Sequence, residues 1–206
     1  MTQLNTPPTT RRLGIACAVS GIVMAVLAVV MYFPIGEADE LQWSYPSAAT
    51  PFAISAALLA ILHLLSAAGY LGLIRLEATG QSRAGRVGLW TAITGLVLLA
   101  CAEAASGAIG AERIDSVAAA VVSAIFGVAS IVFAVGSILA GVVILRARTW
   151  SGPWAWVVLG LGIAIIVLVT PGNAVGIPLA RQLGLLIWSL LFIPLGVEVA
   201  RGRIGR

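Results

Sequence analysis

The chain contains a single histidine, His63, near the middle of an apolar run from Phe52 to Ile74. Small residues share its face of the expected helix, whereas Leu58 and Leu65 fall on the opposite face. An ionisable side chain at that depth in a bilayer costs at least about 2.5 kcal/mol when it is charged. Two interpretations stay open: a neutral imidazole that is hydrogen-bonded within the bundle, or a functional group that binds a proton or a ligand.

Glu103, toward the end of the apolar run from Val87 to Gly107, is the second candidate. If the helix ends near Ala102, Glu103 is the first solvated residue of a loop; otherwise it is a buried carboxylate, protonated or paired. Counted from the span centres, it lies about six residues, or roughly 9 Å, nearer the external side than His63.

Side chains lean toward the N-terminus of their own helix, so two residues on antiparallel neighbours with this offset lean toward each other. We therefore expect His63 and Glu103 to form one polar site that binds a cation or carries a proton near neutral pH. The full set of ligand- or proton-binding candidates is His63, Glu103, Tyr70 and Ser106.

Other chemistry has little support in the sequence. Zinc sites usually need three or four convergent ligands, but no carboxylate pair at helical spacing lies inside an apolar run, and neither a G-x-S-x-G nor a P-loop sequence occurs. Cys17 and Cys101 differ in expected depth by roughly 15 Å, too far apart for a disulfide. We predict no catalytic residue, no metal site and no cofactor, and we do not expect an enzyme.

Composition defines the elements that must position these residues. Of the 206 residues, 60% are hydrophobic and 10% are charged, against about 25% charged in soluble domains. This predicts an all-α polytopic membrane protein with a bundle of six transmembrane helices in one domain, 13–199. The predicted spans are 13–33, 52–74, 87–107, 117–145, 154–170 and 183–199, between a disordered tail over 1–12 and a basic tail over 200–206.

Orientation follows from the arginines, which make up all 12 basic residues because the chain has no lysine. With a cytoplasmic N-terminus, ten arginines lie in cytoplasmic segments and only Arg113 and Arg181 in external ones. The positive-inside rule therefore predicts that both termini are cytoplasmic. Arginine without lysine, together with abundant alanine, glycine and valine, indicates a G+C-rich bacterial genome and hence a multi-pass protein of the plasma (inner) membrane.

Small residues recur at steps of four and three in two of the runs, on one helix face in each. Such stripes let another helix backbone approach closely in lipid, and we expect Gly127 and Ser130 to face a neighbouring helix. Direct contact between the first and fourth spans is one interpretation, and chance alignment is the other. The helix-packing candidates are Ser123, Gly127, Ser130, Ala134, Ser137, Gly141, Gly14, Ala18, Gly21 and Ala25.

Three functional classes remain, and an intramembrane enzyme has the least support of them because the sequence contains no set of nucleophile, base and metal ligands. The first is a small transport or sensing protein with a polar intramembrane site around His63. The alternative is a non-catalytic membrane subunit or scaffold that packs against a partner through its small-residue faces. The expected partners are the lipid bilayer and either another membrane protein or further copies of this chain. Nucleic acid is not expected, because membrane topology alone explains the positive charge.

Overall fold

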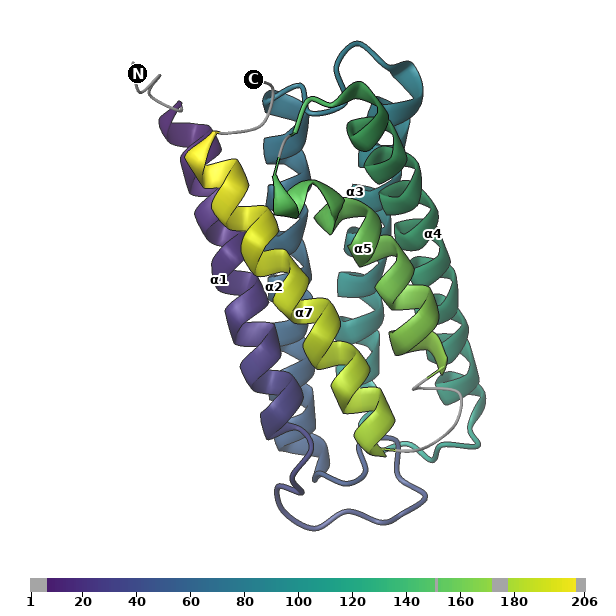
Figure 1. The fold of residues 1–206 in the computed structure, drawn as a ribbon. Helices are drawn as coiled ribbons and strands as arrows, with labels where there is room; N and C mark the ends of the chain where they lie inside the picture. Colours follow the sequence, from purple (N-terminus) through teal and green to yellow (C-terminus); the bar gives the residue numbers. More distant parts are fainter. Residues whose placement is uncertain (1–6, 151, 172–177, 203–206) are drawn as a thin grey trace.

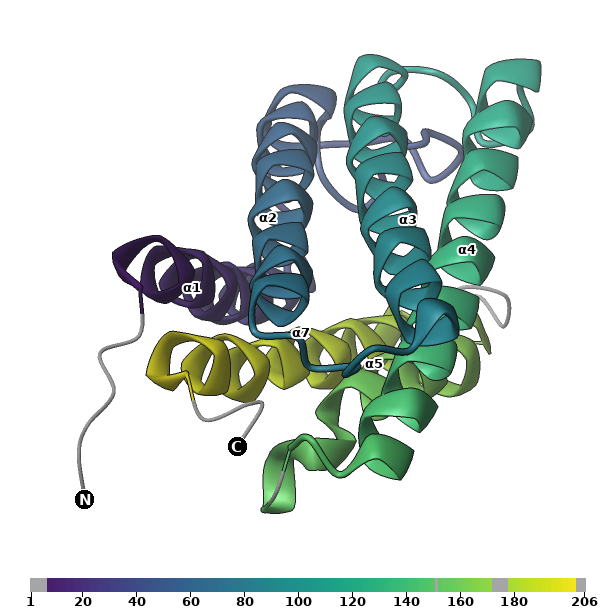
Figure 2. The same ribbon diagram turned by 90° about the horizontal axis from the view of Figure 1, so that it is seen from above.

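The computed structural model describes residues 7–150, 152–171 and 178–202, and the described chain is a helical bundle (Figure 1). Its elements are α1 (Pro8–Val30), α2 (Ala49–Arg75), α3 (Arg83–Ala108), α4 (Val117–Ala147), the 3₁₀ helix η1 (Pro153–Trp156), α5 (Val157–Ala164), the π-helix η2 (Ile165–Val169) and α7 (Pro178–Arg201). Seen along the bundle, α2, α3 and α4 form one row, and α1, α7 and α5 lie together on one side of that row (Figure 2).

Five of the described helices, α1 to α4 and α7, are long and apolar enough to cross a membrane. The fifth predicted span is shorter: the apolar helix Trp154–Val169 covers roughly 24 Å at 1.5 Å per residue, less than the ≈ 30 Å hydrocarbon core of a bilayer. The architecture is therefore that of a multi-span helical membrane protein with five long apolar helices and a short one.

The pairs α1 and α7 and α3 and α4 are antiparallel. Gly14 near the start of α1 meets Ala200 near the end of α7, and Gly88 near the start of α3 meets Ala140 near the end of α4. One end of the bundle therefore holds the starts of α1 and α3 and the ends of α2, α4 and α7. We call it the arginine end, because its described arginines are Arg11, Arg12, Arg75, Arg83, Arg86, Arg146, Arg148 and Arg201. The opposite end is called the loop end.

Several helices extend beyond their predicted bounds. The helix α1 begins at Pro8, so residues 8–12 of the predicted tail are helical; proline is well tolerated there because the first N–H groups of a helix lack intrahelical partners. The helix α3 continues to Ala108, so Glu103 is a helical residue rather than the start of a loop. Residues 1–6 and 203–206 of the predicted tails lie outside the described residues.

The small residues of α1 pack as a stripe, but against α7 and α2 instead of α4. A Cβ on Gly14 would overlap the backbone of Ala200, and a Cβ on Gly21 would lie 2.9 Å from the carbonyl oxygen of Ser189. Gly14, Gly21 and Ala25 are buried and Ala18 is half-buried. The contact considered between the first and fourth spans is not found: α1 lies on the far side of α2 and α7 from α4 (Figure 2).

Only part of the stripe on α4 is packed within the chain. Ala134, Ser137 and Gly141 are buried, and Gly141 contacts Leu159 of α5. Nearer the loop end, Ser123 and Gly127 are exposed, and Ser130 is half-buried. The expectation that Gly127 faces a neighbouring helix of the chain is wrong, because a Cβ placed there would meet nothing within 4 Å. The tight contact with α3 uses a different glycine, Gly136, whose Cβ would collide with the backbone of Ala92.

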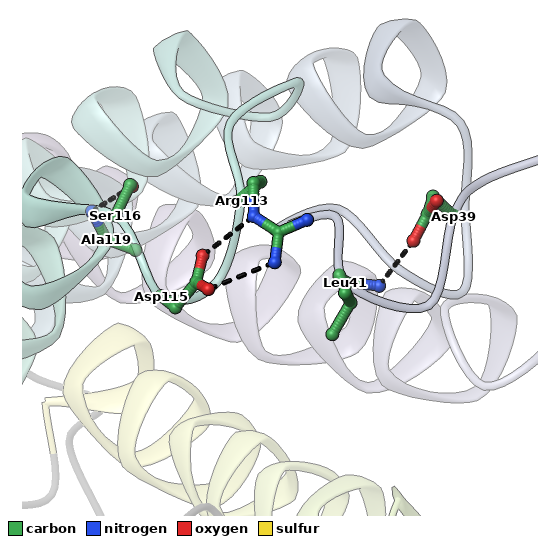
Figure 3. A network of polar contacts seen from close by, with 6 residues as sticks. All are labelled: Asp39, Leu41, Arg113, Asp115, Ser116 and Ala119. Carbon is green, nitrogen blue, oxygen red and sulfur yellow. Dashed lines mark hydrogen bonds and ion pairs between the residues drawn. The ribbon is translucent and has the colours of Figure 1, made fainter.

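Two connecting segments bind each other at the loop end. The backbone N–H of Trp43 donates to Glu112 O at 2.8 Å, and that of Ile114 donates to Leu41 O at 2.8 Å. Beside them, Arg113 donates two hydrogen bonds to the Asp115 carboxylate, at 2.9 and 3.0 Å (Figure 3). The hydrogen bonds and charge of Arg113 hold the pKa of Asp115 below its ordinary value. The following Ser116 caps α4 by accepting from the backbone N–H of Ala119.

Candidate functional site

His63 lies inside the bundle, as its place on α2 predicted, with 5% of its surface exposed. Its Nδ1 lies 2.8 Å from the carbonyl oxygen of Leu59, one turn earlier in the same helix. A carbonyl can only accept, so in the neutral ring Nδ1 carries the hydrogen and Nε2 keeps the free lone pair. The histidine is thus held in one tautomer by its own helix, with its basic nitrogen available to another group.

The imidazole faces Trp188 of α7, with ring centroids 5.9 Å apart. Trp188 in turn makes edge-to-face contacts with Phe133 of α4 at 5.5 Å and with Phe192 at 4.9 Å. These rings join the row of α2, α3 and α4 to α7 across the centre of the molecule. Phe133 can reach that position because Gly95 of α3 leaves room for its backbone.

The indole N–H of Trp188 is buried and has no hydrogen-bond acceptor among the described residues. Buried tryptophan N–H groups usually find a partner, and leaving a buried donor unpaired costs about 1–3 kcal/mol. Within the described part of the chain, a tryptophan whose buried N–H has no acceptor thus lies beside a histidine whose Nε2 can accept a hydrogen bond. A polar ligand or a water molecule that enters here would find both a donor and an acceptor.

Glu103 occupies the buried face of α3 but is itself only half-buried. The buried residues Leu89, Ala92, Leu96 and Leu99 recur at steps of three and four, and Glu103 takes the next position in that series, before Ser106. No hydrogen bond or ion pair of its carboxylate is found with the described residues, His63 included. The one polar site predicted from these two side chains therefore stays a prediction.

The packing of α3 against α2 shows how far Glu103 and His63 are offset along the bundle. Gly107 of α3 lies against Ala53 and Ala56 of α2, which places Glu103 opposite residues 58–59. Glu103 is then four to five residues, or roughly 7 Å, nearer the loop end than His63. The offset is close to the one expected from the sequence.

Tyr70 and Ser106, the other candidates, each have a hydrogen-bond partner already. The Tyr70 hydroxyl is fully buried and lies 2.7 Å from the hydroxyl of Ser137, which joins α2 to α4. Ser106 accepts a hydrogen bond of 2.9 Å from the indole of Trp43, which fixes the first loop-end segment to α3. The described geometry of both residues is that of structural contacts.

A further ionisable residue, Arg181, is half-buried in the bundle and was not among the candidates from the sequence. Its region was taken for a loop, whereas α7 begins at Pro178. The buried face of α7 contains Trp188, Phe192, Leu195 and Val199, and Arg181 extends the same spacing by two helical turns. Its Nε is buried without a hydrogen-bond partner in the described chain. Continuing the 4–3 spacing of α7 back beyond Leu183 would have found it.

The register between α7 and α2 orders these residues by depth. Leu195 lies against Gly69 and Val199 against Gly72, so Arg181 is level with residues 54–55 of α2. Arg181 is thus roughly 6 Å nearer the loop end than Glu103, which is itself roughly 7 Å nearer than His63. In depth along the bundle axis, Arg181, Glu103 and His63 therefore come in that order from the loop end.

Metal binding has no support within the described chain, where no group of three or more histidine, cysteine, aspartate or glutamate side chains gathers. Comparison with known proteins adds no relative: no protein-family model, no curated protein and no solved structure matches the sequence. The arrangement of the described residues is therefore the basis for the functional assignment.

Proposed function

We propose that the protein is a small membrane transporter or sensor that takes up protons, or a small polar solute, at a site around His63. The observation that carries the proposal is the buried indole N–H of Trp188, which has no acceptor among the described residues and belongs to a ring whose centroid lies 5.9 Å from that of the imidazole. An apolar interior penalises such a donor, and ionisable residues inside membranes generally serve function. A site that is occupied only part of the time accounts for both features.

The order of the side chains suggests how a proton would arrive. Glu103 is half-buried and is nearer the loop end, so it is the first group to exchange protons with the external solution. It passes a proton inward, through water, to Nε2 of His63, which lies roughly 7 Å deeper along the bundle axis. The hydrogen bond from Nδ1 to Leu59 holds the ring in place while Nε2 gains and loses that proton. Arg181, nearest the loop end, would attract an anionic solute.

Histidine-selective ¹⁵N labelling tests the site directly, because His63 is the only histidine in the chain. We expect the Nδ1-protonated tautomer at high pH and conversion to imidazolium as the pH falls on the loop-end side of liposomes. Glu103→Gln should shift the midpoint of that conversion. Thr94→Val, a change on the exposed face of α3, should leave it in place.

Proton flux provides the second measurement. Liposomes loaded with a pH-sensitive dye should acidify faster with the protein than without it, and His63→Phe and Glu103→Gln should each slow that flux by about a hundredfold or more, within the range of general acid–base effects. If His63 keeps one tautomer and never titrates between pH 4 and 9, and the flux equals that of empty liposomes, proton handling is excluded.

The topology within this proposal is six passes, with α5 and η2 as a short, tilted fifth pass, and with the arginine end in the cytoplasm of a bacterial cell. The clustering of arginines at one end of the bundle supports it. Reporter fusions at Ser82 and after Arg206 should then read as cytoplasmic, and fusions at Ala38 or Arg113 as external. An external C-terminus would contradict the model.

A second candidate function is favoured by the exposed half of α4. Ser123 and Gly127 are exposed on an apolar helix, and no atom of the described residues lies within 4 Å of a Cβ placed on Gly127. Such small residues are typical of helix–helix contacts in membranes. The protein would then be a subunit that binds a second copy or another membrane protein there. Gly127→Leu should weaken cross-linking between copies, or to that partner, without lowering the stability of the monomer.

A further inference from the structure

The outer surface of the bundle carries a groove where α1 and α7 cross near the arginine end. Its walls include Ile15, Val19 and Ile22 of α1 and Val197 of α7, and its mouth is formed by Arg11 and Arg201. The three α1 side chains are each about half exposed and share one face of the helix. The groove is therefore apolar along its length and cationic at one end.

The floor of the groove is shallow because small residues bring the two helices into backbone contact. A Cβ on Gly196 would overlap the backbone of Ala18 and of Gly14, and a Cβ on Gly14 would overlap that of Ala200. Side chains larger than alanine would fill this space. A straight, flexible apolar chain is of the width and chemistry that the groove accommodates.

The two arginines at the mouth retain unused hydrogen-bond donors. Arg201 makes one hydrogen bond, from Nη1 to the nearly buried carboxylate of Glu198 at 3.3 Å, and its side chain remains 53% exposed. Arg11 is exposed, and no ion pair of its side chain with a described residue is found. Each guanidinium carries five N–H donors in a fork that suits phosphate oxygens.

We propose that this groove is a specific binding site for an anionic phospholipid, whose phosphodiester binds Arg11 and Arg201 while one acyl chain lies along Val19 and Ile22. Charge complementarity selects this occupant: a zwitterionic lipid would also bring a cation to a mouth that already carries two. Basic pockets between transmembrane helices are sites where anionic headgroups bind. The proposal does not depend on the role of His63.

Native mass spectrometry of the full chain in neutral detergent tests the site, with equimolar phosphatidylglycerol and phosphatidylcholine of identical acyl chains. The wild-type protein should retain phosphatidylglycerol preferentially. Arg11→Gln should weaken that binding about fivefold, the factor that corresponds to about 1 kcal/mol per arginine at an anionic headgroup. The double variant Arg11→Gln/Arg201→Gln should bind both lipids equally. Arg12→Gln, at the same end but outside the groove, should behave as wild type.

A second pair of variants tests whether an acyl chain lies against the apolar walls of the groove. Val19→Phe, inside the groove, should lower retention of both lipids, whereas Val26→Phe, on the exposed surface of the same helix beyond the groove, should not. Equal retention of the two lipids by the wild-type protein would overturn the proposal, as would unchanged selectivity in the double variant. Competition by millimolar glycerol 3-phosphate would also overturn it, because the site would then belong to a soluble phosphate compound.

Discussion

The two halves of α4 have similar sequences and different environments. Toward the arginine end, Gly136 and Gly141 lie against the backbones of α3 and α5, and no side chain larger than hydrogen fits at either position. Toward the loop end, Gly127 belongs to the same stripe of small residues as Gly141 but has open space around it. A stripe of small residues thus permits close packing without requiring it, and whether a helix comes close depends on the rest of the bundle.

Substitution by leucine at the packed Gly136 and at the exposed Gly127 should give the largest difference in stability. In Gly136→Leu the side chain would collide with the backbone of Ala92, so α3 and α4 must separate. We expect a loss of at least about 3 kcal/mol, the upper end of over-packing costs, or no folded protein at all. Gly127→Leu should change stability by less than about 0.5 kcal/mol, as surface substitutions usually do. Thermal unfolding in detergent measures both, and equal losses would show that α4 is covered along its whole length.

Removing the hydroxyl of Tyr70 should have an intermediate effect on the packed half of α4. The change Tyr70→Phe leaves the ring contact with Phe133 but removes the 2.7 Å hydrogen bond to Ser137. We expect a loss of about 1 kcal/mol, within the range for hydrogen bonds between membrane helices. Ser137→Ala should cost a similar amount, and the double variant should cost little more than either. Additive losses would show that the hydroxyls act independently.

The smallest effect is expected at the exposed start of α4, where Arg113 binds Asp115. Hydrogen bonds from Arg113 lower the pKa of Asp115, so any stabilisation from the pair is present above the ordinary carboxyl pKa and is lost as the pH falls below about 4. Both side chains are exposed to solvent, which screens the pair. Melting temperatures of wild type and Asp115→Asn should therefore agree within error from pH 7 to pH 3. A clear difference at pH 7 that disappears at pH 3 would mean that the loop end is more tightly ordered than its exposure indicates.

Some residues of the candidate site could be predicted from the sequence, and others could not. His63 was found from its type and depth, because a lone ionisable residue in an apolar run stands out without any structure. Arg181 was missed because Pro171, Gly176 and Pro178 indicated a loop that continued to Gln182, whereas α7 begins at Pro178. Trp188 could not be linked to His63, since their contact joins helices 125 residues apart in the chain.

The sequence alone determined that the protein is helical, apolar and multi-spanning, because runs of about 20 apolar residues between arginine-rich segments have few other stable structures. It also placed the histidine on an inward face, since helical periodicity is a local property. The tertiary structure decided which small residues are packed, that α1 pairs with α7, and that the indole of Trp188 lies beside His63 without an acceptor. Those features depend on contacts between segments that are distant in the chain. In lipid, such contacts depend on how well two whole helix surfaces fit together, and a repeat of small residues in one helix does not specify that fit.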